Sequence, residues 1–125
     1  MSVERKSQII AVIDDDEAMQ DSLHDLLEAA GLAARSFGSA EEYLKSDLHR
    51  KAGCLIVDIR MPKMSGLELQ AKLKEEEYDV PIIFITAHGD ARMRIQAMRR
   101  GAVEFLAKPF DHQLLLKRVR TALNM

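Results

Sequence analysis

Residues 54–58 read Cys-Leu-Ile-Val-Asp, four apolar residues that end in a carboxylate. A short, continuous apolar run is typical of a strand buried on both faces, as in a parallel sheet. Two further runs have the same character, Ile9–Ile13 (IIAVI) and Pro81–Ile85 (PIIFI). The proline stands at the first position of its run, where a missing hydrogen-bond donor does little harm. The three runs predict the buried strands at the centre of the fold.

Shorter apolar segments alternate with helical patterns on both sides of these runs. Weaker strands are expected at Ala33–Phe37 and Glu104–Ala107, between stretches whose apolar residues recur at helical spacing. Ser39 opens SAEE, which we interpret as a capping box with Glu42, and Asp111 is placed to cap the last helix. The expected helices cover residues 19–30, 40–48, 67–77, 91–100 and 112–123.

Five β–α units in a row predict an α/β fold, a doubly wound parallel sheet of five strands with helices on both faces. Crossover connections between parallel strands are right-handed, which leaves few topologies. No linker, low-complexity tract or longer repeat interrupts the pattern. We therefore expect one domain over residues 1–125, near the commonest domain size.

The composition excludes several other classes of protein. Hydrophobic residues make up 47% of the chain, enough for a real core, and the net charge of −2 leaves no overall footprint for nucleic acid. No segment approaches the ~18 apolar residues that cross a bilayer, and the first apolar run is too short for a signal peptide. The single cysteine, Cys54, is expected to be a buried structural thiol. We expect a cytoplasmic protein with no membrane partner.

Polar residues follow four of the five expected strands. The acids Asp14–Asp16 follow the first strand, Asp58 the third, Thr86 the fourth and Lys108 the fifth. In an open parallel sheet, ligands bind beyond the carboxyl ends of the strands. If the first and third strands are neighbours, the first acids face Asp58 across a small cleft.

This set of side chains suits a divalent cation and a phosphoryl group. Carboxylates that lie close together repel one another unless a positive charge compensates. Magnesium prefers oxygen ligands and binds through one or two carboxylates plus a phosphate. Lys108 and Thr86 bring an ammonium and a hydroxyl group, and phosphoryl transfer depends mostly on positioning and charge stabilisation. Asp58, at a strand end before a loop, can act as a carboxylate nucleophile that forms an acyl phosphate.

Each of these residues also has an ordinary structural interpretation. Acids favour the start of a helix, which alone would account for Asp14–Asp16. Taken singly, Asp58 is a turn residue and Thr86 a strand-end residue. Lys108 alone is a surface lysine, and Phe105 alone is a core residue. The joint placement of the polar residues at one edge of the sheet favours the functional interpretation.

The chain resembles the receiver (CheY-like) domain of response regulators in four stretches, which occur in the family's order and spacing. They are VIDDDE (12–17), IVDIRMPKMSG (56–66), FITAHGD (84–90) and GAVEFLAKPF (101–110). The triple acid and the last two stretches are most similar to the FixJ-type subgroup. The resemblance covers the chain from end to end and implies the strand order 2-1-3-4-5, which the pattern alone does not supply.

The resemblance implies a role for each residue of the site. The family's phosphoacceptor matches Asp58, and its metal-binding acids match Asp14 and Asp15. The backbone carbonyl of Arg60 matches a further ligand of the metal, which is Mg²⁺ in this family, with Mn²⁺ as a substitute. The lysine that binds the phosphoryl group matches Lys108.

The resemblance also implies a switch. The family's switch hydroxyl matches Thr86, and its switch aromatic matches Phe105. Movement of Thr86 toward the phosphoryl group is expected to free space that Phe105 fills by rotating, which repacks the surface of the fourth helix, fifth strand and fifth helix. Arg60 and His88 match positions that modulate hydrolysis of the phosphoryl group, and a cis peptide bond is usual before the proline that matches Pro109.

The implied function is two-component signal transduction. A sensor histidine kinase would donate the phosphoryl group to Asp58, and the domain would catalyse only its own phosphorylation and dephosphorylation. Dimerisation through the fourth helix and fifth strand, or control of an output, is the expected consequence. No direct contact with nucleic acid is expected. FixJ-type receivers usually precede a DNA-binding output domain, so transcription is one candidate output.

Two alternatives stay open at this point. A haloacid-dehalogenase-like phosphatase also forms an aspartyl phosphate on an α/β fold, and Asp14 and Asp16 imitate its Asp-x-Asp motif. That motif continues to Thr or Val where this chain has Ala18, and a cap insertion is missing. The other alternative is a pseudo-receiver, a binding module that is never phosphorylated, and the complete set of polar side chains argues against it.

Overall fold

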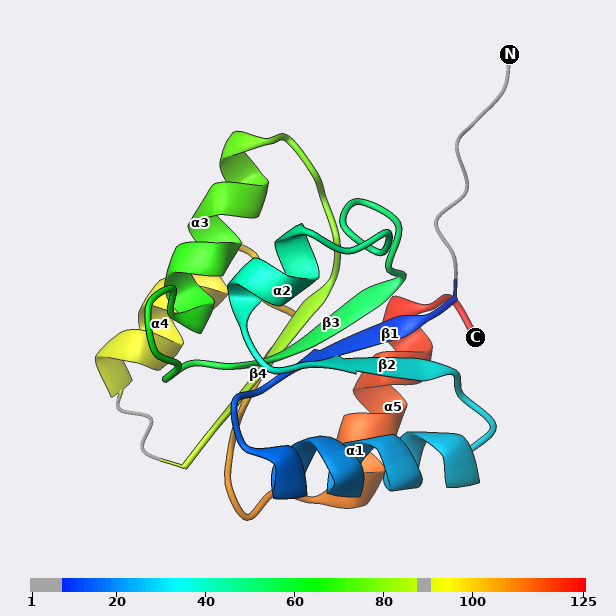
Figure 1. Ribbon diagram of the computed structural model, residues 1–125. Helices are drawn as coiled ribbons and strands as arrows, with labels where there is room; N and C mark the ends of the chain where they lie inside the picture. The colour runs from blue at the N-terminus through cyan, green and yellow to red at the C-terminus, as the bar shows by residue number, and fades with distance from the viewer. Residues whose placement is uncertain (1–7, 88–90) are drawn as a thin grey trace.

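A parallel sheet of five strands forms the central layer of the computed structural model, which describes residues 8–87 and 91–125 (Figure 1). The strands are β1 (Ile10–Ile13), β2 (Ala34–Phe37), β3 (Cys54–Asp58), β4 (Ile82–Thr86) and β5 (Glu104–Ala107). Their order is β2-β1-β3-β4-β5, and every neighbouring pair is parallel. The sheet confirms the doubly wound topology that the resemblance implied.

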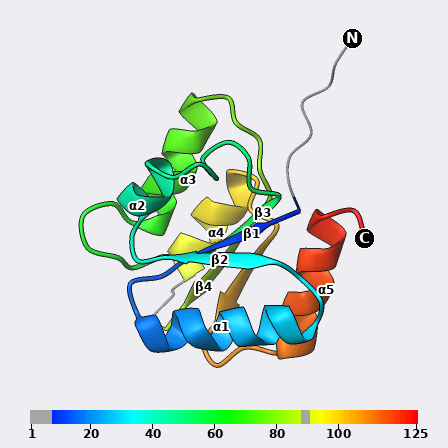
Figure 2. The ribbon, with the colours of Figure 1, turned by 45° about the vertical axis from the view of Figure 1, so that its right-hand side comes forward.

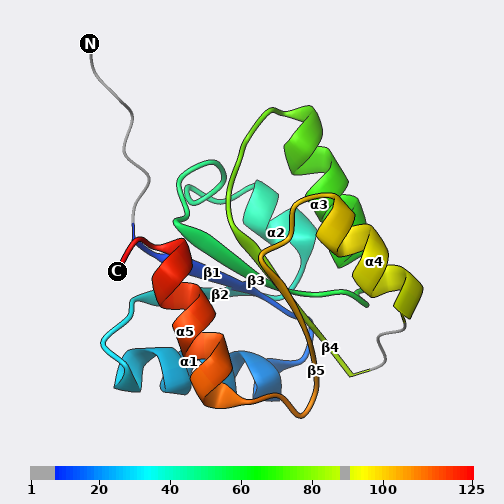
Figure 3. The same ribbon diagram turned by 180° about the vertical axis from the view of Figure 1, so that it is seen from behind.

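The helices of the described residues cover both faces of the sheet. They are α1 (Glu17–Ala29), α2 (Ala40–Leu44), α3 (Gly66–Glu75), α4 (Ala91–Arg99) and α5 (His112–Ala122). Helices α1 and α5 lie on one face and α2, α3 and α4 on the other, as Figure 1 and the reverse view in Figure 3 show. Figure 2 shows β2 between α1 and the layer of α2 and α3. Within the described ranges, no helix is long and apolar enough to span a bilayer.

Each face of the sheet has its own hydrophobic core, and for this reason β1, β3 and β4 are buried throughout. On the side of α2, α3 and α4, the helices contribute Tyr43, Leu69, Leu73 and Ala97. On the side of α1 and α5, they contribute Leu23, Leu27, Leu115 and Val119. Cys54 is wholly buried in this second core, and burial raises the pKa of its thiol to about 12, which confirms the predicted structural thiol.

The N-terminal cap of α2 differs from the prediction, and a complete capping box lies at α3, for which none was predicted. Ser39 caps α2, since its Oγ accepts from the Glu42 N–H at 3.1 Å, but the Glu42 carboxylate accepts from the Gly38 N–H at 2.8 Å. The predicted box is therefore not reciprocal. A complete capping box lies at α3, where the side chains of Ser65 and Glu68 each accept from the other's backbone N–H.

Helix α2 ends at Leu44, four residues before the predicted end. The side chain of Ser46 is the physical reason, because its Oγ donates to the Tyr43 carbonyl at 2.7 Å and accepts from the Leu48 N–H at 3.2 Å. Such side-chain bonds satisfy backbone groups that would otherwise continue the helix. Leu48 is still buried, so it is apolar because it packs in the core and not because it belongs to the helix.

Candidate functional site

The predicted site residues meet at the carboxyl edge of the sheet. Asp14 directly follows β1, Asp58 and Thr86 end β3 and β4, and Lys108 follows β5. Strands β1 and β3 are neighbours, so the first acids face Asp58 as expected. Asp14, Asp58 and Thr86 are 0%, 7% and 1% exposed, which makes this edge an unusually polar part of the interior.

Three carboxylates form a compact cluster. One oxygen from each of Asp14, Asp15 and Asp58 lies within 4.8 Å of the others. Asp16 takes no part in this cluster, because its carboxylate caps α1 by accepting from the Ala18 N–H at 3.0 Å. The structure thus divides the three consecutive acids between a cluster and a helix cap. Clustered carboxylate oxygens at a partly open edge are the donor set that fits Mg²⁺.

Lys108 brings positive charge to the two buried acids. Its Nζ lies 3.3 Å from Asp14 Oδ2 and 3.6 Å from Asp58 Oδ2. The backbone N–H of Lys108 donates to the Thr86 carbonyl at 2.8 Å, which fixes the loop after β5 against the end of β4. The peptide bond to Pro109 is cis, as the resemblance implied. This arrangement aims the ammonium group at the carboxylates with its side chain 16% exposed.

The pKa of the Asp58 carboxyl is raised above its ordinary value. Burial is the largest cause, and the charge of Asp14 adds to it, with a smaller contribution from Asp15. The ammonium of Lys108 and the backbone N–H of Arg60, which donates to Asp58 Oδ1 at 3.2 Å, act in the opposite direction. One lysine therefore does not compensate the acids fully, and a further cation beside them would stabilise the ionised form.

Two supporting residues were not identified from the sequence. The side-chain amide of Gln20 donates to the Asp14 carbonyl at 2.6 Å, and it holds the backbone that carries the first acids. Gly66 lies so close to β3 that an added Cβ would stand 2.5 Å from the Asp58 carbonyl oxygen. The glycine stands in the family-like stretch 56–66, which was the available signal, whereas nothing in the sequence links Gln20 to Asp14.

The candidate switch residues lie on adjacent strands. Thr86 is paired in register with Ala107, and Phe105 is paired with Phe84. Phe105 is 6% exposed and belongs to the core under α2, α3 and α4, so it is a core residue in this structure. Its rotation stays a prediction. His88 lies outside the described residues.

Comparisons with known proteins agree with this geometry. The profile of the response regulator receiver domain matches residues 10–120. Response regulator protein TodT of Pseudomonas putida is 45% identical over 121 residues, which are 96% of this chain and 53% of that protein. Transcriptional regulatory protein FixJ of Bradyrhizobium diazoefficiens is 40% identical over 115 residues, 92% of this chain and 56% of that protein. The crystal structure of FixJ-N aligns with a TM-score of 0.84 and 35% identity over 95% of both chains.

The chain spans about half the length of the curated relatives it matches. FixJ-type regulators are among these relatives, as the quoted stretches predicted, and the matches favour the receiver interpretation over the phosphatase alternative. Receiver domains act in two-component signalling and are not classed as enzymes. Because the receiver-domain profile matches residues 10–120, and Asp14, Asp15 and Asp58 gather at one edge of the sheet, the chain belongs to the response regulator receiver domain family.

Proposed function

We propose that Asp58 accepts a phosphoryl group from the phosphohistidine of a sensor histidine kinase. The observation that carries this proposal is the setting of the Asp58 carboxylate, which ends β3 within 4.8 Å of Asp14 and Asp15 and 3.6 Å from Lys108 Nζ. The Asp58 side chain keeps 11% exposure at this edge, and it is flanked by groups that bind phosphoryl oxygens.

The chain's own residues account for the steps of the transfer. Asp14, Asp15 and Asp58, with the carbonyl of Arg60, would hold Mg²⁺ or Mn²⁺, which would neutralise charge on the phosphoryl oxygens. An oxygen of Asp58 attacks phosphorus in line while the phosphorus–nitrogen bond of the donor breaks and the kinase imidazole leaves. The Lys108 ammonium turns from the carboxylates to a phosphoryl oxygen and stabilises the developing charge. The domain thus catalyses only its own phosphorylation and the later hydrolysis of the acyl phosphate on Asp58.

The switch begins at Thr86. Its hydroxyl would bind a phosphoryl oxygen, and the resulting movement would change the space available to Phe105 on the next strand. Because Phe105 packs in the core under α4, a new rotamer changes the packing of α4 and β5. Phosphorylation thereby biases a two-state surface through contacts made in only one state.

The wider setting follows from the relatives. We infer that residues 1–125 form one receiver domain and that a DNA-binding output domain follows it in the whole protein. The support is that the chain spans about half of its relatives and that one of them is named a transcriptional regulatory protein. We further propose that the receiver makes no direct contact with nucleic acid and acts in the cytoplasm together with its kinase. The phosphorylated form is proposed to dimerise through α4 and β5.

Intact-mass spectrometry after incubation with acetyl phosphate and Mg²⁺ tests the phosphoacceptor. We expect a gain of one phosphoryl group, which is lost in Asp58→Asn and with EDTA. Asp21→Asn removes an exposed acid of α1 and is the matched control, since it should label like the unchanged protein. Full, magnesium-dependent labelling of Asp58→Asn would refute the assignment. Absence of labelling in every form, together with absence of beryllofluoride binding, would identify a pseudo-receiver.

A further inference from the structure

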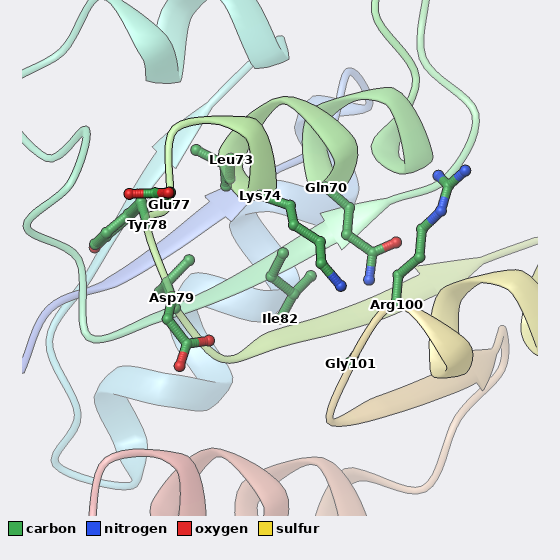
Figure 4. A pocket seen from close by; sticks show the side chains of 10 residues that line it. Gln70, Leu73, Lys74, Glu77, Tyr78, Asp79, Ile82, Arg100 and Gly101 are labelled. Carbon is green, nitrogen blue, oxygen red and sulfur yellow. The ribbon is translucent and has the colours of Figure 1, made fainter.

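A pocket of about 350 Å³ lies between α3 and the turn that follows α4 (Figure 4). Its walls come from the second half of α3, the segment 77–82 that leads into β4, and the turn at Arg100 and Gly101 after α4. Ile82 begins β4, whereas Thr86 at the other end of the same strand belongs to the proposed phosphorylation site. The pocket is therefore at the amino edge of the sheet, and it is separate from the carboxylate cluster.

Gln70 contributes an unusual atom to this pocket. Its side-chain Nε2 donates to the Ala97 carbonyl of α4 at 3.1 Å, and because a carbonyl only accepts, this bond fixes which way the amide is turned. The residue is 4% exposed, and its Oε1 is buried without a hydrogen-bond partner among the residues described. Native proteins leave few buried acceptors unpaired. A hydrogen-bond donor supplied by a bound ligand would satisfy this oxygen.

The charged side chains of the pocket are divided between its two ends. Figure 4 shows the side chains of Lys74 and Arg100 on either side of the Gln70 amide, and those of Glu77 and Asp79 at the far end. The end that holds the unpaired acceptor is thus cationic. An anion is favoured there, and a second anionic group reaching the far end would be repelled.

The floor of the pocket is apolar. Leu73, Val80 and Ile82 line it, and each is at least nine-tenths buried. Tyr78 is also buried, and its hydroxyl is already used in a 2.9 Å bond to the Ala52 carbonyl, so it offers the pocket only its ring. A volume of about 350 Å³ with an apolar floor and a few polar groups matches the smaller ligand sites of proteins.

We propose that this pocket binds a small organic monocarboxylic acid that has an apolar body and a hydroxyl or N–H group beside the carboxylate. The carboxylate lies between Lys74 and Arg100, the neighbouring donor bonds to Gln70 Oε1, and the body covers the apolar floor. The ligand would contact Gln70 of α3, whose side chain also donates to the Ala97 carbonyl of α4, so binding would affect the position of α4.

Mandelate is a suitable probe, because it has a carboxylate, an adjacent hydroxyl and a phenyl ring. Titration should be followed by ¹⁵N NMR on the Asp58→Asn protein, so that the outcome does not depend on phosphorylation. We expect shifts at the Gln70 side-chain amide, Leu73 and Gly101, with a Kd on the order of 1 mM. Phenylacetate, which lacks the hydroxyl, and benzyl alcohol, which lacks the carboxylate, should each bind about tenfold more weakly.

Two variants locate the site. Arg100→Ala should weaken mandelate binding about tenfold, whereas Arg99→Ala removes the adjacent arginine, which does not line the pocket, and should leave it unchanged. Gln70→Leu should remove the preference for mandelate over phenylacetate. If that variant does not fold, Lys74→Ala, at an exposed residue beside the carboxylate, should weaken the binding of mandelate and of phenylacetate alike, and unchanged binding of both would contradict the proposal. Absence of shifts at about 20 mM probe, equal binding of mandelate and phenylacetate, or an equal effect of both arginine variants would overturn the proposal.

Discussion

The Asp58 carboxylate, at the proposed phosphorylation site, lowers the stability of the folded protein when it is ionised. Burial and the charge of Asp14 raise its pKa, and Lys108 compensates only in part. A carboxyl whose pKa is higher in the folded state binds more protons when folded than when unfolded. Stability therefore falls as pH rises from the unfolded-state pKa to the folded-state pKa, and the full cost is present above the latter.

Replacing Asp58 with asparagine is expected to stabilise the protein at neutral pH. Without divalent cations, the melting temperature of Asp58→Asn should be about 3 °C higher at pH 7, because the amide removes a buried charge. At about pH 3, below the ordinary aspartate pKa, the difference should vanish, since both side chains are then neutral. Calorimetry at the two pH values measures this, with Asp21→Asn as the control. A lower melting temperature at pH 7 would mean that the ion pair with Lys108 outweighs the burial.

Divalent cations are expected to make the unchanged protein more stable than Asp58→Asn. At ten times its Kd, Mg²⁺ should raise the free energy of unfolding of the unchanged protein by about 1.4 kcal/mol, because it binds the folded cluster and not the unfolded chain. Asp15→Asn and Asp58→Asn each remove a ligand and should lose this gain. Chemical denaturation with and without Mg²⁺ measures it. A gain that persists in both variants would place the cation elsewhere.

At the scale of whole elements, the contact between α3 and β3 decides how Asp58 is presented. Gly66 is the first residue of α3, and its N–H donates to the Ile59 carbonyl at 2.9 Å. The close approach of its Cα to the Asp58 carbonyl leaves no room for a side chain. The complete capping box at Ser65 starts the helix at the same place. Cap and glycine together set the distance between the helix and the strand that carries the phosphoacceptor.

Gly66→Ala is expected to disturb both stability and phosphorylation. The added Cβ would stand 2.5 Å from a backbone oxygen of Asp58, so the strand end or the helix must shift. We expect a loss of about 2 kcal/mol in the free energy of unfolding and slower labelling by acetyl phosphate. Gly38→Ala is the control, because its Cβ would meet side chains and no backbone, namely the flexible Glu42 carboxylate at 2.9 Å and the Gln20 amide nitrogen at 3.8 Å. Equal losses in both variants would argue against the backbone contact as the cause.

On the scale of the whole molecule, charge is divided between two helices that lie on opposite faces of the sheet. Helix α1 carries acids and neither lysine nor arginine, whereas α4 carries arginines and no acid. Helix α4 also exposes large apolar side chains, Ile95 at 51% and Met98 at 37%. Exposed apolar residues ringed by charge are typical of surfaces that bind a partner. This composition supports the proposal that α4 forms part of the dimer interface.

Ile95→Asp is expected to prevent that dimer without affecting phosphorylation. Sedimentation velocity with Mg²⁺ and beryllofluoride should give a dimer of the unchanged protein and a monomer of the variant, since a buried carboxylate at the interface is costly. Labelling by acetyl phosphate should stay within about twofold, because Ile95 is an exposed residue that takes no part in the carboxylate cluster. Ala33→Asp, at an exposed position before β2, is the control and should still dimerise. A dimer of Ile95→Asp would exclude this part of α4.

The sequence by itself determined the strands, the class of fold and the acids at the strand ends. Continuous apolar runs such as those before Asp14 and Asp58 are stable only when both faces are covered, so local composition is enough to place them. Parallel strands then bring the residues that follow them to one edge, which is why Thr86 and Lys108 were predicted at the site without any distance information. The sequence motifs around these residues were sufficient to identify the receiver domain family.

Only the tertiary structure decided how neighbours in the sequence divide their tasks. Asp14 and Asp16 are two residues apart, yet one joins the cluster and the other caps α1. The bond from Gln70 to Ala97, the pocket beside it and the contact of Gly66 with β3 join segments whose sequences contain no sign of each other. Periodicity reports which face of an element is buried. Which residues meet across that face depends on the distances and angles at which elements pack, and those are properties of the folded chain alone.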